Sequence, residues 1–316
     1  MAGGDWTPSE LGSSILTAWY KADSISGSDG DGVSSWEDSS GNGNDSSQGV
    51  AARQPTLQTN ELNGQPVVRF DGSNDIISEG DIADMDVGAG DIWMACLFKS
   101  ADNSGVQFLF EKGGNQFGLV VTSAGELHAR LGTSSNPPKQ SSGNWSRTDF
   151  VMVTASRVSS TCNGFLNGSD MTTTGTTNSG SINNSNFFDI GAGSVGGQPT
   201  NGDIAEILVG GATLTTANRE KVEGYLAWKY GLQANLPSDH PYRFSKPKID
   251  PIVWTGERGS SLNNAENWSG GVVPTAKDKV LFNSGAVDAL SGSLTAGSVH
   301  IADGYTGNIG SSASPI

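Results

Sequence analysis

Short apolar stretches that alternate with polar residues, each bounded by Gly, Asn, Ser or Pro, recur along most of the chain and limit the folds open to it. Side chains two residues apart lie on one face of a β-strand, so this period predicts strands rather than helices. The predicted strands cover residues 15–20, 67–70, 92–99, 106–110, 117–121, 127–131, 150–155, 187–190 and 204–209. Many short strands without alternating helices predict antiparallel layers, as in an all-β sandwich or jelly roll.

A turn motif and the composition support this interpretation. Asn167-Gly168, directly after Gly164-Phe-Leu166, is typical of a type I′ hairpin turn. The 316 residues include 44 Gly and 12 Pro, and only 16% are charged, which suits a chain with many turns and argues against a mainly helical protein. Eight Trp, 11 Phe and five Tyr supply enough apolar area to exclude wholesale disorder.

The charge balance bears on partners. Asp and Glu number 33 against 18 Lys and Arg, a formal net charge of −15, so the average surface repels nucleic-acid phosphates and anionic lipid. We therefore expect neither nucleic acid nor a membrane as partner. The longest uncharged apolar run, Ile92–Phe98, is far shorter than the ~20 residues that a membrane helix needs.

The first residues and the cysteines bear on the compartment. Met1–Trp6 lacks the basic and apolar regions of a secretory signal, so the protein as written is expected to be made and kept in the cytoplasm. Two cysteines, Cys96 and Cys162, are too few for disulfides to stabilise a fold of this length. Both lie in strand-like runs, which favours buried free thiols over a disulfide.

One segment follows a helical period instead. Its apolar residues recur at three- and four-residue steps, at Val222, Tyr225, Leu226 and Tyr230. This spacing predicts an amphipathic helix over residues 216–230 that packs on the sandwich, with an exposed partner-binding helix as the alternative. Thr215 or Thr216 can cap the first turn, and Gly231 can adopt the left-handed conformation that ends the helix.

Four prolines between residues 235 and 251 mark a domain boundary, because they prevent regular structure and stiffen the chain. We therefore predict a jelly-roll domain at 1–234, a Pro-rich linker at 235–251 and a small β module at 252–316. Strand-like pieces of this module lie at 280–282, 298–301 and 308–309. So short a module buries little apolar surface, so we expect it to dock against a neighbour.

Five sequence patches carry a resemblance to a known superfamily. In chain order they are Ala18–Asp23, Val33–Asp45, Ala52–Thr56, Asn63–Gly72 and Gly202–Leu208. Together they resemble the laminin-G-like, concanavalin A-like lectin/glucanase superfamily over about residues 10–242. The resemblance implies a two-sheet jelly roll used mostly for recognition, often of glycans and sometimes with calcium. It leaves the ligand open, because function depends on sites built onto a fold.

The C-terminal module has a separate signature. Trp254-Thr-Gly256, Asn267–Pro274 and Asp278–Phe282 look like the opening module of β-helical surface proteins of bacteria and of some bacteriophage structural proteins. The repeats expected after such a module barely begin before Ile316. We therefore expect a docking or capping segment rather than a long solenoid.

Clustered acids between Glu79 and Asp86 raise a glycosidase interpretation, because such enzymes use paired carboxylates as acid and nucleophile. The acids at 79, 81, 84 and 86 cannot all face one side of a strand, and Gly80 and Gly88 indicate a solvated loop. We predict an acidic turn here, and no catalytic residue in the chain.

The segment Ser28–Asp38 partly matches a calcium loop. Asp29, Asp31, Gly32 and Asp38 occupy its third, fifth, sixth and twelfth positions. The first position is Gly27, which offers no side-chain oxygen, and the last is Asp rather than a bidentate Glu. Turn chemistry of Asp and Gly is the preferred interpretation, calcium the alternative, and no other cofactor is expected.

Other motifs carry weaker hypotheses. Gly191–Gly196 matches a dinucleotide fingerprint, but Gly197-Gln-Pro199 excludes the helix that would receive the pyrophosphate, which favours a loop. Three histidines are far apart in sequence and expected to be structural or exposed: His128, His240 and His300. Four tryptophans are candidate sugar platforms, with core positions preferred for each: Trp36, Trp93, Trp145 and Trp228. No ligand-binding residue is selected by these patterns.

Two functions of different class follow. The first is a non-enzymatic bacteriophage virion surface protein, a homo-oligomeric head decoration protein made in the host cytoplasm, whose segment 252–316 binds a capsid or other virion protein. The alternative is a carbohydrate-binding adhesin module of a secreted or cell-surface bacterial protein, which meets cell-surface glycans outside the cell. Enzyme activity ranks third.

Overall fold

The computed structural model describes residues 5–101, 105–114, 116–133, 137–193, 197–249, 252–254, 261–268, 273–275, 279–282, 294–296, 298–301, 310–311 and 314–315. The chain forms two compact units, Thr7–Lys246 and a second made of Met1–Trp6 with Pro247–Ile316. The boundary at Lys246 falls inside the Pro-rich segment, whose first part belongs to the larger unit. Within the described ranges, no helix is long and apolar enough to cross a bilayer.

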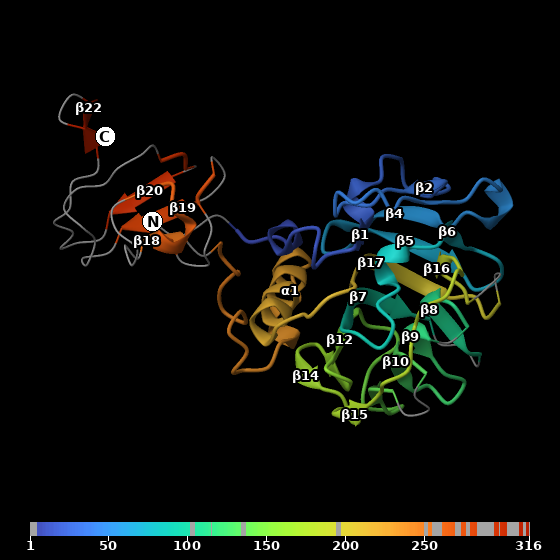
Figure 1. Cartoon of the computed structure of the whole chain (residues 1–316). Helices are drawn as coiled ribbons and strands as arrows, with labels where there is room; N and C mark the ends of the chain where they lie inside the picture. Colours follow the sequence, from blue (N-terminus) through green and yellow to red (C-terminus); the bar gives the residue numbers. More distant parts are fainter. Residues whose placement is uncertain are drawn as a thin grey trace. The chain divides into compact units, whose positions relative to one another are not determined.

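The larger unit is built on two antiparallel sheets (Figure 1). One has nine strands: β1 (Ala18–Lys21), β4 (Thr56–Leu62), β5 (Gln65–Asp71), β7 (Ile92–Ser100), β12 (Val151–Val158), β13 (Thr161–Leu166), β14 (Ser169–Asp170), β15 (Thr176–Thr177) and β17 (Asn201–Gly210). Its strand order is β14-β13-β12-β7-β17-β5-β4, with β1 paired to β17 and β15 to β13. The turn between β13 and β14 has positive φ at Asn167 and Gly168, as a type I′ hairpin requires.

The second sheet has eight strands: β2 (Ser35–Trp36), β3 (Ser46–Ser47), β6 (Ile77–Glu79), β8 (Gln107–Lys112), β9 (Phe117–Val121), β10 (Leu127–Leu131), β11 (Lys139–Gln140) and β16 (Phe188–Ile190). They lie in the order β11-β10-β9-β8-β16-β6-β3-β2. The larger unit also contains short 3-10 helices: η1 (Pro8–Leu11), η2 (Ala22–Ser24), η3 (Ala51–Arg53), η4 (Ala83–Met85) and η6 (Gln233–Asn235).

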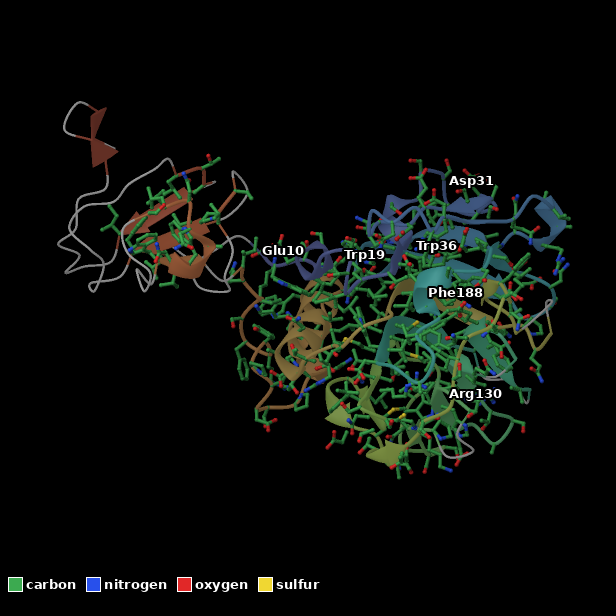
Figure 2. All side chains as sticks on the ribbon, in the orientation of Figure 1. Glu10, Trp19, Asp31, Trp36, Arg130 and Phe188 are labelled. Atoms are coloured by element: carbon green, nitrogen blue, oxygen red, sulfur yellow. The ribbon has the colours of Figure 1, made fainter. Side chains whose placement is uncertain are left out.

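The main core lies between the two sheets, which confirms the predicted β-sandwich. It contains the alternate apolar residues of β5, β9, β10 and β17, together with Trp36 and Phe188, which lie inside the unit (Figure 2). Asp31, in contrast, is exposed at the surface of the unit. The central strand β7 is buried on both faces, because the helix covers the outer face of the nine-stranded sheet. This double burial explains why Ile92–Phe98 is a continuous apolar run.

The predicted helix is α1 (Thr216–Lys229), which begins with Thr215 accepting a hydrogen bond from Asn218 N and is followed by Gly231 at φ +69°. Two fully buried glutamates join it to the sheet. Glu206 of β17 accepts hydrogen bonds from Trp19 Nε1 at 2.5 Å and from Tyr230 and Lys229. Glu223 of α1 accepts from Arg219 and Thr154 and is hydrogen-bonded to His240. The helix therefore packs on the sandwich, as its apolar stripe predicts.

In the smaller unit, three strands form a parallel sheet: β18 (Ile252–Trp254), β19 (Lys279–Phe282) and β20 (Ser298–Ile301). Trp254, Trp268 and Phe282 form its core, with the two indole rings 4.9 Å apart. The remaining elements are η7 (Ala265–Asn267), β21 (Gly310–Ser311) and β22 (Ser314–Pro315). The strand predicted at 308–309 lies outside the described residues.

Candidate functional site

A row of mostly polar residues crosses the outer face of the eight-stranded sheet. Residues directly opposite each other on paired strands share a face. The pairing connects, from β10 to β3, Arg130, Gly118, Glu111, Asp189, Ser78 and Ser47. The residues on either side of Asp189, namely Phe188 and Ile190, are in the core, so this polar row faces away from it. Glu111 and Asp189 are nevertheless almost fully buried.

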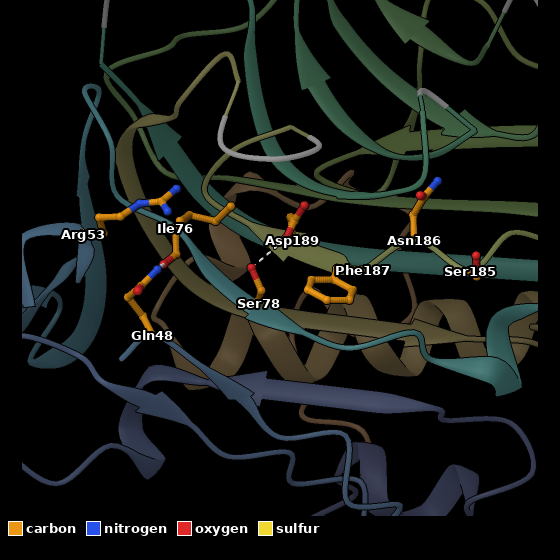
Figure 3. Close-up of a pocket in the computed structure, with 8 residues that line it drawn as sticks. All are labelled: Gln48, Arg53, Ile76, Ser78, Ser185, Asn186, Phe187 and Asp189. Atoms are coloured by element: carbon orange, nitrogen blue, oxygen red, sulfur yellow. Dashed lines mark hydrogen bonds between the residues drawn. The ribbon is translucent and has the colours of Figure 1, made fainter. Parts of the chain in front are cut away.

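A pocket of about 470 Å³ lies over the β16–β6 part of the polar row. Its lining is drawn in Figure 3 and consists of Gln48, Arg53, Ile76, Ser78, Ser185, Asn186, Phe187 and Asp189. The volume is within the range of small-molecule sites, roughly 300–1,000 Å³. We refer to it as the Phe187 pocket.

A hydrogen-bonded pair lies between the two ends of the pocket lining. Ser78 Oγ donates to Asp189 Oδ1 over 2.6 Å, drawn as a dashed line in Figure 3. Register places the two residues opposite each other on β6 and β16, so the sheet itself brings the hydroxyl to the carboxylate. The Asp189 carboxylate is therefore held in one orientation and can accept further hydrogen bonds only along defined directions.

One wall is the segment that ends in η3, and it is held by backbone and amide contacts. Gln48 Nε2 donates to Ile76 O at 2.8 Å, and Ile76 N donates to Arg53 O at 3.1 Å. Gln54 Nε2 donates to Gln48 O at 2.7 Å, which closes the segment on itself. These bonds fix the backbone from which the Arg53 side chain extends toward the pocket (Figure 3).

The opposite wall precedes β16 and carries an aromatic ring. Phe187 is 59% exposed, whereas its neighbour Phe188 is completely buried. Two adjacent residues of an extended chain point to opposite faces, so only one of the two rings can enter the core. Asn186 and Ser185 lie beside the ring, and Asn186 N donates to Asn184 Oδ1 at 2.9 Å. This end of the pocket thus presents an apolar face flanked by an amide and a hydroxyl.

Comparison with known families matches the sandwich. Residues 91–218, from the start of β7 to the first turn of α1, match the Laminin_G_3 family model, described as the Concanavalin A-like lectin/glucanases superfamily. The sandwich has a concanavalin A-like fold. The family match includes β8 and β16 of the polar row and leaves out Gln48, Arg53, Ile76 and Ser78 of the pocket.

Solved structures give only distant likenesses. Trypanosoma rangeli sialidase matches at 12% identity and TM-score 0.44, over 72% of this chain and 36% of that chain. Domain 4 of AbnA, a GH43 extracellular arabinanase from Geobacillus stearothermophilus, in complex with arabinotriose, matches at 15% identity and TM-score 0.41, over 65% and 96%. The W1252A mutant of HCR D/C VPI 5995 matches at 11% and 0.48, over 67% and 52%.

At these TM-scores the likenesses carry no argument about this chain. The chain spans about a third of the length of the sialidase chains that it matches. No curated protein matches the sequence.

The acidic segment of the concanavalin A-like domain forms ion pairs with one lysine. Lys112 Nζ lies 2.8 Å from Asp81 and 3.0 Å from Asp86, and the lysine is completely buried. It also donates to Asn184 O at 2.8 Å. Burial raises the pKa of Glu79, the acid at the end of β6. Asp81 and Asp86 balance the Lys112 charge, and Asp81, Asp86 and Glu79 are all absent from the lining of the Phe187 pocket.

In the candidate calcium loop, the carboxylates accept hydrogen bonds from backbone amides of turns and neighbouring strands. Asp31 Oδ2 accepts from Ser28 N at 2.7 Å, and Asp29 Oδ1 accepts from Thr59 N at 2.9 Å. Asp38 accepts from the backbone amides of Trp19, Ser40 and Asn44. Among the described residues no three His, Cys, Asp or Glu side chains gather as a metal site would require. Calcium at this loop stays the untested alternative to turn chemistry.

The dinucleotide-like glycines follow β16, and residues 194–196 lie outside the described part. Gly191 has φ +89°, and a Cβ there would lie 2.0 Å from Phe70 Cε1. Its amide donates to Leu109 O at 2.9 Å and its carbonyl accepts from Thr200 N at 2.7 Å. Close packing beneath the loop therefore accounts for glycine at 191 without a phosphate ligand.

The histidines have separate surroundings. His128 on β10 contacts Glu126 at 3.0 Å, and burial lowers the pKa of its ring. His240 is buried against Glu223. His300 is on β20, and its side chain lies outside the described residues.

None of the four candidate tryptophans lines the pocket. Trp36 and Trp93 are completely buried, and Trp93 Nε1 donates to Ile15 O at 3.1 Å. Trp145 and Trp228 are half-buried, and their Nε1 atoms donate to Gly125 O and Tyr242 O. Cys96 and Cys162 are buried free thiols, as predicted.

The residues that form the pocket were missed by sequence reasoning. The sequence does contain one usable signal, the Phe187-Phe188 doublet at the start of a predicted strand. Because adjacent strand residues face opposite sides, one of the two rings had to leave the core. The pairing of Ser78 with Asp189 joins residues 111 positions apart, and no local pattern indicates such a contact.

Proposed function

We propose that the concanavalin A-like domain is a non-enzymatic carbohydrate-binding module, and that the Phe187 pocket takes one sugar residue. The observation that supports this most is an exposed phenylalanine ring beside a buried carboxylate fixed by a serine hydroxyl. A pyranose has the complementary surface, with an apolar C–H face and hydroxyls around its edge. Stacking on Phe187 and hydrogen bonds to Asp189, Asn186 and Ser185 would use both.

Binding rather than hydrolysis is favoured by the count of acids. Glycoside hydrolysis uses two carboxyl groups on either side of the scissile bond, about 5–5.5 Å apart for retention and roughly 6.5–9.5 Å for inversion. Asp189 is the one acidic side chain among the described residues that line the pocket. Its Oδ1 already accepts the Ser78 hydroxyl. We therefore assign Asp189 to ligand orientation.

A glycan array tests this proposal. The full chain should bind a subset of sugars saturably, and Phe187→Ala should lose that binding. Phe244→Ala is the matched control, because Phe244 is 80% exposed and lies outside the pocket. The proposal is contradicted if the protein binds no sugar on a broad array, or if the wild-type and Phe187→Ala proteins bind equally.

The biological setting is a second proposal. We propose that this module is displayed on a bacteriophage virion as a homo-oligomeric head decoration protein, with residues 252–316 bound to a capsid or other virion protein. The phage-like motifs of that segment support this. So does its exposed apolar surface, since Val299 and Ile301 are 38% and 49% exposed. The alternative is an adhesin module of a secreted or cell-surface bacterial protein.

Two observations separate these settings. Co-sedimentation of the protein with purified particles, lost when Val299 and Ile301 are both replaced by Ser, supports the virion proposal. A monomer that never associates with particles contradicts it. Genes for capsid and portal proteins beside this gene favour the virion, and genes for a secretion system favour the adhesin.

A further inference from the structure

We infer that the Phe187 pocket selects a sugar that carries a carboxylate, and that the Arg53 guanidinium binds this carboxylate. The inference rests on the proposed function, because it names the class of sugar that the same pocket takes. Its basis is that the pocket lining includes one cationic side chain, Arg53, to which none of the described residues is bound.

Cationic side chains are scarce and mostly engaged in this acidic chain, which has 18 Lys and Arg against 33 Asp and Glu. Lys112 is paired with Asp81 and Asp86, and Lys229 with Asp23 and Glu206. Cationic side chains without an acidic partner make other contacts. Arg157, for example, donates hydrogen bonds to backbone carbonyls. Lys21 lies 4.8 Å above the Trp19 ring.

Arg53 differs from all the other lysines and arginines whose side chains the structure describes. Its guanidinium has no ion pair, hydrogen bond or ring contact with any residue in the described part of the chain. Its backbone, in contrast, is held on both sides, by Arg53 N to Val50 O at 2.9 Å and by Ile76 N to Arg53 O at 3.1 Å. The side chain therefore leaves a fixed backbone and reaches the pocket with its five donors unused.

A guanidinium recognises a carboxylate better than it recognises a hydroxyl. Its planar fork donates two parallel hydrogen bonds to the two carboxylate oxygens, and these charge-assisted bonds are about twice as strong as neutral ones. The partly enclosed pocket lessens the screening that weakens an ion pair on an open surface. A carboxylated sugar therefore gains a bidentate contact that its neutral counterpart lacks.

The other lining residues determine in which direction the carboxylate of the bound sugar points. Asp189 is an acceptor that repels a second carboxylate and favours hydroxyl donors. Figure 3 shows Arg53 at one end of the lining and Asn186 with Ser185 at the other, with Ile76 and Asp189 between them. The sugar carboxylate thus lies at the Arg53 end, its hydroxyls meet Asp189 and Asn186, and its C–H face covers Phe187.

The test compares sugars that differ only in this group. Titrations use galacturonate and galactose oligomers of equal length and linkage, together with a galactose oligomer that carries a sulfate. The proteins are wild type, Arg53→Gln, Arg53→Lys and, as charge-matched control, Arg243→Gln. Arg243 is in the same unit and lies outside the pocket, where it donates to Ala234 O and lies 5.6 Å from the Phe244 ring centroid.

We expect wild type and Arg243→Gln to prefer the carboxylated oligomer by about tenfold or more, as a hydrogen-bonded charge pair implies. Arg53→Gln should remove the preference without weakening binding of the neutral oligomer. Arg53→Lys should keep part of it, because a point charge lacks the bidentate fork. Phe187→Ala should weaken binding of all oligomers.

Three outcomes overturn the inference. In the first, the wild-type protein binds neutral and carboxylated oligomers equally and Phe187→Ala loses both. This result supports sugar binding in the pocket but refutes selection of a carboxylate. Binding of the sulfated oligomer alone shows that the pocket takes a different anion. No saturable binding of any oligomer, on an array that includes many other carboxylated and neutral sugars, overturns the inference and the proposed function together.

Discussion

Ser78 and Asp189 lie opposite each other on β6 and β16, and Ser78 Oγ donates to Asp189 Oδ1 over 2.6 Å. This hydrogen bond joins two neighbouring strands of the eight-stranded sheet, where the sheet lines part of the Phe187 pocket. It satisfies one oxygen of a carboxylate that is only 5% exposed. The same bond therefore contributes to folding and to the shape of the site.

Replacing Ser78 by Ala removes this donor. A buried carboxylate that loses one hydrogen bond costs about 1–3 kcal/mol, so the free energy of unfolding should fall by that amount in urea titrations. Ser47→Ala is the matched control, because Ser47 is the exposed neighbour of Ser78 in the polar row and should change stability by less than about 0.5 kcal/mol. Equal stability of the two variants would refute the assignment of this bond.

Arg157 provides a test of how the loops beside the sandwich are held. Its buried guanidinium donates five hydrogen bonds, at 2.7–2.9 Å, to the carbonyls of Gly88, Gly90, Leu131 and Gly180. Arg157→Met keeps an unbranched apolar stem but removes the guanidinium and leaves these carbonyls without donors, and should cost about 3 kcal/mol or more.

Thermal or urea unfolding followed by tryptophan fluorescence measures that loss. Arg243→Met is the control and should change stability only slightly, since Arg243 donates one hydrogen bond, to Ala234 O at 3.0 Å, and lies over the exposed Phe244 ring. A stability loss for Arg157→Met no larger than that of the control would show that water replaces the guanidinium without cost.

The two thiols should be inert in the folded protein. Burial raises the pKa of Cys96 well above its ordinary value, and the Glu206 carboxylate adds to this effect. Burial likewise raises the pKa of Cys162, although Arg157 and Thr176 oppose it. Because the thiolate is the reactive form, a thiol reagent at pH 8 should modify neither residue until the chain unfolds, and then both. Rapid modification of the native protein would contradict the described burial.

Sequence pattern alone was enough to predict the sandwich and its helix, because both depend on local apolar periods. The alternation in residues 117–121 and 127–131 matches β9 and β10 residue for residue. The helix predicted at 216–230 ends one residue earlier. In contrast, β4 was missed, since Thr56–Leu62 is mostly polar and forms the edge of its sheet, where only one neighbour constrains it.

The candidate site was not predictable in this way. Its walls and floor come from segments near residues 48–53, 76–78 and 185–189, which only the sheet register brings together. The buried glutamates show the same limit. Glu206 sits within an apolar strand and Glu223 within a helix, and their partners Trp19, Lys229, Arg219 and His240 become evident only when the helix is docked.

Titration of a sugar selected from the array, by calorimetry, into wild type, Phe187→Ala and Phe244→Ala tests the central claim most directly. Both phenylalanines are exposed, at 59% and 80%, so neither change should affect stability. Loss of ring stacking should weaken binding by Phe187→Ala about tenfold, and Phe244→Ala should bind like wild type. A sugar that binds all three proteins with equal affinity would show that the Phe187 pocket is not the site.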